Sequence, residues 1–124
     1  MKAAIIILAD PNGGTEEALG RVFNALALAA ELKQNGDEVA VVFNGAGTRW
    51  PAELTKLTHP ANGLYNSVRD VVQGASCGCA DVFGATAGLE SCGVPLKKDN
   101  ALAGTSGLLS LRQYLVDGWQ TIVF

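Results

Sequence analysis

Two cysteines, Cys77 and Cys79, stand one residue apart in a glycine- and serine-rich stretch that leads into a helical pattern. In a protein of the cytoplasm, such a thiol pair more often serves redox, sulfur-transfer or metal chemistry than a structural disulfide. Cys79 directly precedes Ala80, where the helix is expected to begin, and the free N–H groups at a helix start stabilise a thiolate. The charge of Asp81 opposes that effect. The sequence therefore predicts either a reactive thiol or two cysteines that fill space in a packed turn.

The third cysteine, Cys92, is expected at the far end of the predicted helix 80–92. At 1.5 Å of rise per residue it would lie roughly 20 Å from Cys79, beyond the reach of a disulfide. We interpret Cys92 as a small buried apolar residue. Three cysteines and the sole histidine, His59, have the composition of a zinc site, but Cys-x-Cys lacks the usual ligand spacing. We predict no metal and no cofactor.

Composition limits the class of protein. The chain of 124 residues is interpreted as a single domain over residues 1–124, with 48% apolar residues to build a core. Only 17% of residues are charged, which favours a surface partly covered by another subunit. The net charge of −3 argues against nucleic acid. The apolar run at residues 3–9 is too short for a membrane helix and has no cleavage site after it, so it predicts a strand of a cytoplasmic protein.

The first forty residues predict a strand–helix–strand unit. Residues 3–8 and 38–43 are apolar runs typical of strands buried on both faces, and residues 16–34 have helical spacing with Thr15 as N-cap. Two strands joined by one helix should be parallel. The helix is apolar on more than one stripe, which predicts a subunit contact and hence a homo-oligomer.

The remaining pattern predicts helices at residues 51–57, 64–73, 80–92 and 106–116, the last with Leu108, Leu109, Leu111 and Leu115 facing inward. Short strands are expected at residues 94–96 and 119–124, and residues 74–78 are either a strand or a turn. The whole predicts an α/β fold with a mostly parallel sheet of four to five strands and helices on both faces.

Three loops should meet beyond the carboxyl ends of the strands: residues 10–15, 44–50 and 74–79. Neither of the first two matches a phosphate-binding motif, and Glu16 and Glu17 would repel a phosphate. Arg49 and Trp50, a cation and an aromatic residue, do follow the second strand. The favoured interpretation is a solvated Arg and a Trp packed on the next helix, and a small anionic ligand is the alternative hypothesis to test. The candidate ligand-binding residues are Asn12, Gly13, Asn44, Gly45, Arg49 and Trp50.

Residues 74–84, with the Gly93-Val94-Pro95-Leu96 segment, resemble the DsrE/DsrF-like (YchN-like) sulfur-relay superfamily. Residues 20–26, 41–47 and 117–124 are similar to that group as well, so the resemblance spans nearly the whole chain. It implies a compact α/β fold with a parallel sheet, assembled as trimers or hexamers. It also implies that Cys79 carries sulfur as a persulfide.

The leading hypothesis is thus a cytoplasmic sulfur carrier or sulfurtransferase-like protein that exchanges sulfur with a donor or acceptor protein. Cys77 would resolve the persulfide on Cys79 by forming a disulfide. One alternative is a small-molecule or anion binding module of the same fold with no covalent chemistry. Another is a purely structural partner subunit.

Overall fold

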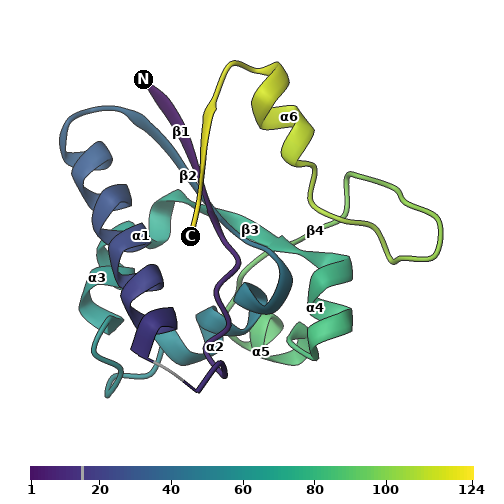
Figure 1. Ribbon diagram of the computed structural model, residues 1–124, viewed down its shortest axis with the longest axis horizontal. Coiled ribbons are helices and arrows are strands. Elements are labelled where there is room, and N and C mark those ends of the chain that lie inside the picture. The colour runs from purple at the N-terminus through teal and green to yellow at the C-terminus, as the bar shows by residue number, and fades with distance from the viewer. Residues whose placement is uncertain (15) are drawn as a thin grey trace.

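Five strands form one sheet in the order β4-β3-β2-β1-β5, and every neighbouring pair is parallel (Figure 1). The computed structural model describes residues 1–14 and 16–124. The strands are β1 (Lys2–Ile7), β2 (Glu38–Phe43), β3 (Val72–Ser76), β4 (Leu96–Lys97) and β5 (Gln120–Val123). The predicted α/β class with a parallel sheet is confirmed, with five strands.

The two strands β1 and β2 lie at the apolar runs that predicted buried strands. β1 and β2 pair in register from Lys2 opposite Glu38 to Ile7 opposite Phe43, and each is buried after its first residue. A strand covered on both faces has no solvent side, so its sequence does not alternate between apolar and polar residues.

Helices lie on both faces, as predicted. They are α1 (Glu16–Gln34), α2 (Trp50–Leu54), α3 (Asn62–Val68), α4 (Cys77–Phe83), α5 (Thr86–Ser91) and α6 (Leu111–Val116), with short 3-10 turns η1 (Gly45–Arg49) and η2 (Arg69–Val71). The larger core forms where α1 and its neighbours pack on Ile5, Val41 and Phe43. On the opposite face, Leu109 and Tyr114 pack on Ile6 and Val42. None of the described helices is long and apolar enough to cross a bilayer.

The region around the cysteines differs from the prediction of one helix at residues 80–92. α4 begins earlier, at Cys77, and ends at Gly84, whose φ of 67° is left-handed. Glycine adopts this conformation without a steric cost, so it ends a helix readily. α5 then starts a separate helix at Thr86. The distance argument along one helix therefore does not hold for Cys92.

Two other elements were predicted too long. The helix expected at residues 64–73 stops at Val68, and after η2 the chain enters β3 at Val72, so the uncertain stretch 74–78 belongs partly to a strand. The helix expected at residues 106–116 covers only Leu111–Val116, and the Ser110 side chain caps it by accepting the N–H of Gln113 at 3.3 Å. Leu109 is buried as expected, but Leu115 is 60% exposed, so its predicted inward position is wrong.

The wide apolar face of α1 is largely used inside the chain. Ala25 and Leu32 are buried in the main core, and Ala18 and Leu28 pack against it. The feature that predicted a subunit contact thus has an explanation within one protomer, and the homo-oligomer stays a prediction. The proposed N-cap of this helix, Thr15, lies outside the described residues.

Candidate functional site

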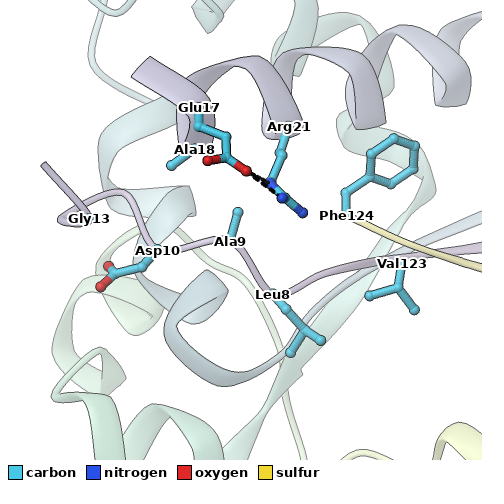
Figure 2. Close-up of a pocket in the computed structure, with 9 residues that line it drawn as sticks. All are labelled: Leu8, Ala9, Asp10, Gly13, Glu17, Ala18, Arg21, Val123 and Phe124. Atoms are coloured by element: carbon cyan, nitrogen blue, oxygen red, sulfur yellow. Dashed lines mark hydrogen bonds and ion pairs between the residues drawn. The ribbon is translucent and has the colours of Figure 1, made fainter. Parts of the chain in front are cut away.

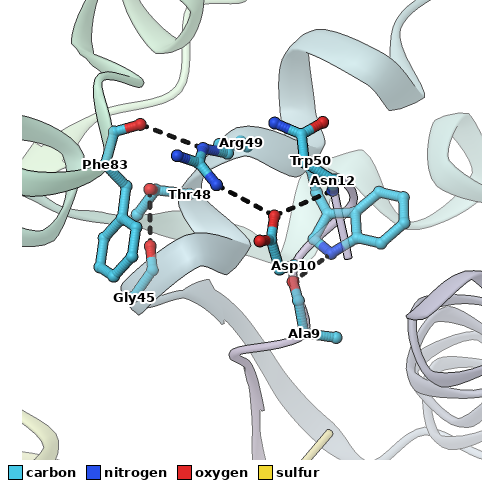
Figure 3. A network of polar contacts seen from close by, with 8 residues as sticks. All are labelled: Ala9, Asp10, Asn12, Gly45, Thr48, Arg49, Trp50 and Phe83. Carbon is cyan, nitrogen blue, oxygen red and sulfur yellow. Dashed lines mark hydrogen bonds and ion pairs between the residues drawn. The ribbon is translucent and has the colours of Figure 1, made fainter. Parts of the chain in front are cut away.

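The loops that follow β1 and β2 meet through Arg49 (Figure 3). Its Nη1 donates to Asp10 Oδ1 at 3.1 Å, and its Nε donates to the carbonyl oxygen of Phe83, also at 3.1 Å. The guanidinium also lies over the Phe83 ring, 5.4 Å from its centroid. One cation therefore ties the first loop and the second loop to the end of α4.

Trp50 and Gly47 pack the second loop tightly against the end of β1. The indole Nε1 donates to the carbonyl oxygen of Ala9 at 2.7 Å, and Trp50 is only 3% exposed. A Cβ on Gly47 would lie 2.1 Å from the carbonyl oxygen of Ile7, so only glycine fits there. Trp50 is thus buried, in agreement with the interpretation of a packed Trp.

Of the other predicted ligand-binding residues, Asn12, Gly13 and Gly45 have contacts within the loops, whereas the side-chain oxygen of Asn44 has no hydrogen-bond partner among the described residues. The backbone N–H groups of Asn12 and Gly13 donate to Asp10, to Oδ1 at 2.9 Å and to the carbonyl oxygen at 3.1 Å respectively. The side chain of Asn44 is buried. The carbonyl oxygen of Gly45 accepts the hydroxyl of Thr48 at 2.7 Å.

Asp10 is the centre of this cluster. The backbone N–H of Asn12, and then the Arg49 guanidinium, hold the pKa of the Asp10 carboxyl below its ordinary value despite an opposing effect of burial. Because Arg49 is already paired with a carboxylate, an anionic ligand would have to compete with Asp10 for it.

Cys77 and Cys79 both lie in the first turn of α4, and both are half-buried free thiols. Cys79 is thus the third residue of its helix and not the residue before it. The backbone N–H of Gly78 donates to the carbonyl oxygen of Gly107 at 2.7 Å. A Cβ on Gly78 would lie 2.6 Å from a methyl carbon of Leu108. The glycine between the two cysteines therefore lets the segment 104–108 pack on the helix start.

This packing leaves a cavity of about 610 Å³ between α4 and the segment 104–108. Cys79 of α4 and Ser106 of the segment both line it. The full lining consists of Gly78, Cys79, Asp81, Val82, Phe83, Gly104, Thr105, Ser106 and Leu108. Cys77 is not among these residues, so the two thiols have different surroundings.

A chain of polar contacts runs along the same region. Cys77 Sγ lies 3.6 Å from Ser106 Oγ, and the Ser106 hydroxyl donates to Asp81. The other carboxylate oxygen of Asp81 accepts the hydroxyl of Thr86 at 3.1 Å. From the sequence, Asp81 is expected only as an opposing charge, and nothing in the pattern points to Ser106, which is 25 residues further along the chain.

Residues i and i+2 of a helix do not face each other. A disulfide between Cys77 and Cys79 would therefore require the first turn of α4 to unwind. Cys92 lies elsewhere, with its Sγ 3.4 Å from the hydroxyl oxygen of Thr55. His59 accepts the N–H of Ala61 at Nδ1, as a turn residue does. Among the described residues, no three His, Cys, Asp or Glu side chains converge as metal ligands would.

A second cavity, of about 410 Å³, lies at the ends of β1 and β5 beside α1 (Figure 2). β5 pairs with β1 on the side away from β2, so this cavity sits where the chain order across the sheet reverses. Its two charged helix residues, Glu17 and Arg21, are paired with each other. Much of the remaining wall is apolar, including Leu8 and Val123.

Fold and cavity together define a parallel α/β protein with a thiol at the carboxyl end of its third strand. The chain is 32% identical to uncharacterized protein MJ0733 of Methanocaldococcus jannaschii over 103 residues, which is 82% of this chain and 78% of the relative. The chain therefore belongs to the family of that archaeal protein. No family model matches the chain. No solved structure matches it significantly.

Proposed function

We propose that this protein is a cytoplasmic sulfur carrier that holds a sulfur atom as a persulfide on Cys79. The observation that carries the proposal is the position of this free, half-buried thiol in the wall of the 610 Å³ cavity. A carrier needs a thiol that a donor can reach, and the lining includes exposed residues such as Val82 and Ser106, so the cavity is open to solvent. The sequence resemblance to the sulfur-relay superfamily supports the same role.

The transfer is an exchange of one sulfur–sulfur bond for another. The Cys79 thiolate attacks the outer sulfur of a donor persulfide, R–S–SH, and a new S–S bond forms at Cys79. The S–S bond of the donor breaks, and the donor leaves as the thiolate R–S⁻. The proton stays on the transferred sulfur, and no external oxidant or reductant takes part. Delivery to an acceptor thiol is the same step in reverse.

The geometry favours Cys79 over the other two cysteines. Cys77 is not itself in the cavity lining, although its Sγ lies 3.6 Å from the hydroxyl oxygen of the lining residue Ser106, and Cys92 lies against Thr55. The first turn of α4 would have to unwind before Cys77 could reach Cys79. The proposal therefore leaves release of the sulfur to the thiol of the acceptor and gives Cys77 no resolving role.

The test is to load the protein with a freshly prepared alkyl persulfide and measure the intact mass. Wild type, Cys77→Ser and Cys92→Ser should each gain the mass of one sulfur atom, and Cys79→Ser should not. Cys92→Ser is the matched control because it removes a half-buried thiol away from the cavity. Equal loading of Cys79→Ser, or no loading of wild type, would overturn the proposal.

The alternative of an anion-binding module gains no support from the loops. Its key cation, Arg49, is paired with Asp10 and also donates to Phe83. Trp50, its aromatic partner, is buried with its indole N–H bonded to Ala9.

A further inference from the structure

We propose that the Cys79 cavity selects uncharged or cationic low-molecular-weight sulfur compounds over anionic ones, and that Asp81 determines this specificity. The inference rests on the proposed function in one respect only, namely that the compound entering the cavity is the sulfur donor. The selection by charge follows from the cavity itself, whatever reaction takes place there.

The wall of the cavity carries a negative charge. Among the described residues that line the cavity, Asp81 is the one that carries a formal charge at neutral pH. Its carboxylate accepts hydroxyl groups from two different segments, Ser106 and Thr86. Two such bonds hold the negative charge beside the path to Cys79, so an approaching anion meets a fixed charge of its own sign.

Three positive groups lie near enough to the cavity to oppose Asp81: the start of α4, Arg49 and Lys98. Lys98 lies against Gly107 but is not in the cavity lining. The start of a helix contributes at most about half an elementary charge, which is less than the full charge of a carboxylate. At α4 that contribution is reduced further, because the N–H of Gly78 is bonded to Gly107. Arg49 approaches the cavity residue Phe83, but its charge is paired with Asp10. Neither the helix start nor Arg49 offers an incoming anion a free positive partner.

The size and the apolar surface of the cavity suit a small organic compound. Small-molecule sites have volumes of about 300–1,000 Å³ and mostly apolar walls, and the cavity has about 610 Å³. Val82, Phe83 and Leu108 supply apolar surface beside the thiol. An alkyl thiol or alkyl persulfide can place its carbon chain on these walls and its sulfur at Cys79. A small inorganic anion such as thiosulfate has no such chain and would carry its charge toward Asp81.

The test uses two methanethiosulfonate reagents that differ in charge, the cationic 2-aminoethyl and the anionic 2-sulfonatoethyl compound. Each reacts with a thiolate to form a mixed disulfide, and methanesulfinate leaves. The protein is the double variant Cys77→Ser with Cys92→Ser, in which Cys79 is the remaining thiol. The ratio of the cationic to the anionic rate is measured at low salt in the folded protein and, as a reference, in the same protein unfolded in urea.

The folded protein should prefer the cationic reagent about threefold to tenfold over the unfolded reference, since one nearby unit charge acts with opposite sign on the two reagents. Asp81→Asn removes the charge, keeps one of the two acceptor oxygens and replaces the other with an amide N–H₂ group, which can donate to a hydroxyl oxygen. It should bring the ratio to within about twofold of the reference. Glu90→Gln is the matched control, because it removes an exposed acid of α5 outside the cavity lining. It should leave the ratio unchanged.

Added salt provides a test without a substitution. At about 0.5 M salt the preference of the wild-type cavity should shrink, because the Debye length falls to a few ångströms. An equal ratio in folded and unfolded protein, or a preference that survives Asp81→Asn, would overturn the inference. The reagents carry no transferable persulfide sulfur, so this result is independent of the loading test and the two proposals can fail separately.

Discussion

Two regions at the carboxyl edge of the sheet differ in whether they leave a reactive group facing a cavity. Around Arg49, the loops after β1 and β2 bind each other: the guanidinium bonds to Asp10 and Phe83, and the indole of Trp50 bonds to Ala9. At the start of α4, by contrast, Cys79 is a free thiol in the wall of a large cavity. Polar groups that satisfy each other stabilise the fold, whereas a group left facing a cavity is open to a ligand.

Residue types alone do not decide whether Arg49 and Trp50 bind a ligand or hold the loops together. A cation next to an aromatic residue at a strand end is equally suited to bind an anion and to hold loops together. The deciding fact is the carboxylate of Asp10, which comes from another loop 39 residues earlier in the chain. Three predictions test the structural role of the Arg49 region, from the largest expected effect to the smallest.

The largest effect is expected at Gly47. In Gly47→Ala the new Cβ would lie 2.1 Å from the carbonyl oxygen of Ile7, at the end of a buried strand. The loop must move, and we expect the free energy of unfolding to fall by about 3 kcal/mol. Gly20→Ala is the matched control. It adds a methyl group in the open on α1 and should raise stability by about 0.5–1 kcal/mol. Urea unfolding measures both, and equal stabilities would contradict the tight packing.

A middle effect is expected at Trp50. Trp50→Phe keeps most of the buried ring but removes the hydrogen bond from Nε1 to Ala9. Because the carbonyl oxygen of Ala9 is then left without a partner, the free energy of unfolding should fall by about 1–3 kcal/mol. Trp119→Phe serves as the control because this half-buried ring packs edge-on against Tyr114 at 5.4 Å between centroids. If both substitutions cost the same, the indole hydrogen bond has no special role.

The smallest effect is a titration. The Asp10 carboxyl has a lowered pKa, and its largest cause is the N–H of Asn12, with Arg49 adding to it. Arg49→Met should therefore raise the pKa measured by NMR, but only part of the way to the ordinary value. A carboxyl whose pKa is lowered by folding stabilises the fold above its unfolded pKa, and that stabilisation is lost as the pH falls through the folded value. A pKa unmoved by Arg49→Met would contradict the pairing.

The sequence was sufficient for the centre of the fold. β1, β2 and α1 have long patterns of apolar residues that follow from burial on one or both faces. These patterns do not depend on how the loops are arranged. The parallel arrangement of the strands followed from the helix that joins the first two. These elements depend on local pattern and on topology, both of which can be inferred from the chain itself.

The segment around residues 106–110 could not be predicted in this way. Its leucines have helical spacing, yet the N–H of Leu109 donates to the Ser76 hydroxyl at 3.1 Å and Gly107 accepts from Gly78. These contacts with β3 and α4 join residues about thirty positions apart and override local preference. The same contacts bring Ser106 to Asp81. The sequence therefore identifies Cys79 but cannot predict the cavity that these contacts form around it.

The central claim is that the reactive sulfur of this molecule is Cys79 in its cavity. The most direct measurement is the persulfide content of wild type and of the three single Cys→Ser variants, by intact mass after loading with an alkyl persulfide. The account predicts one added sulfur atom on every protein except Cys79→Ser. Loading that survives in Cys79→Ser, or that is lost in Cys92→Ser instead, would contradict it.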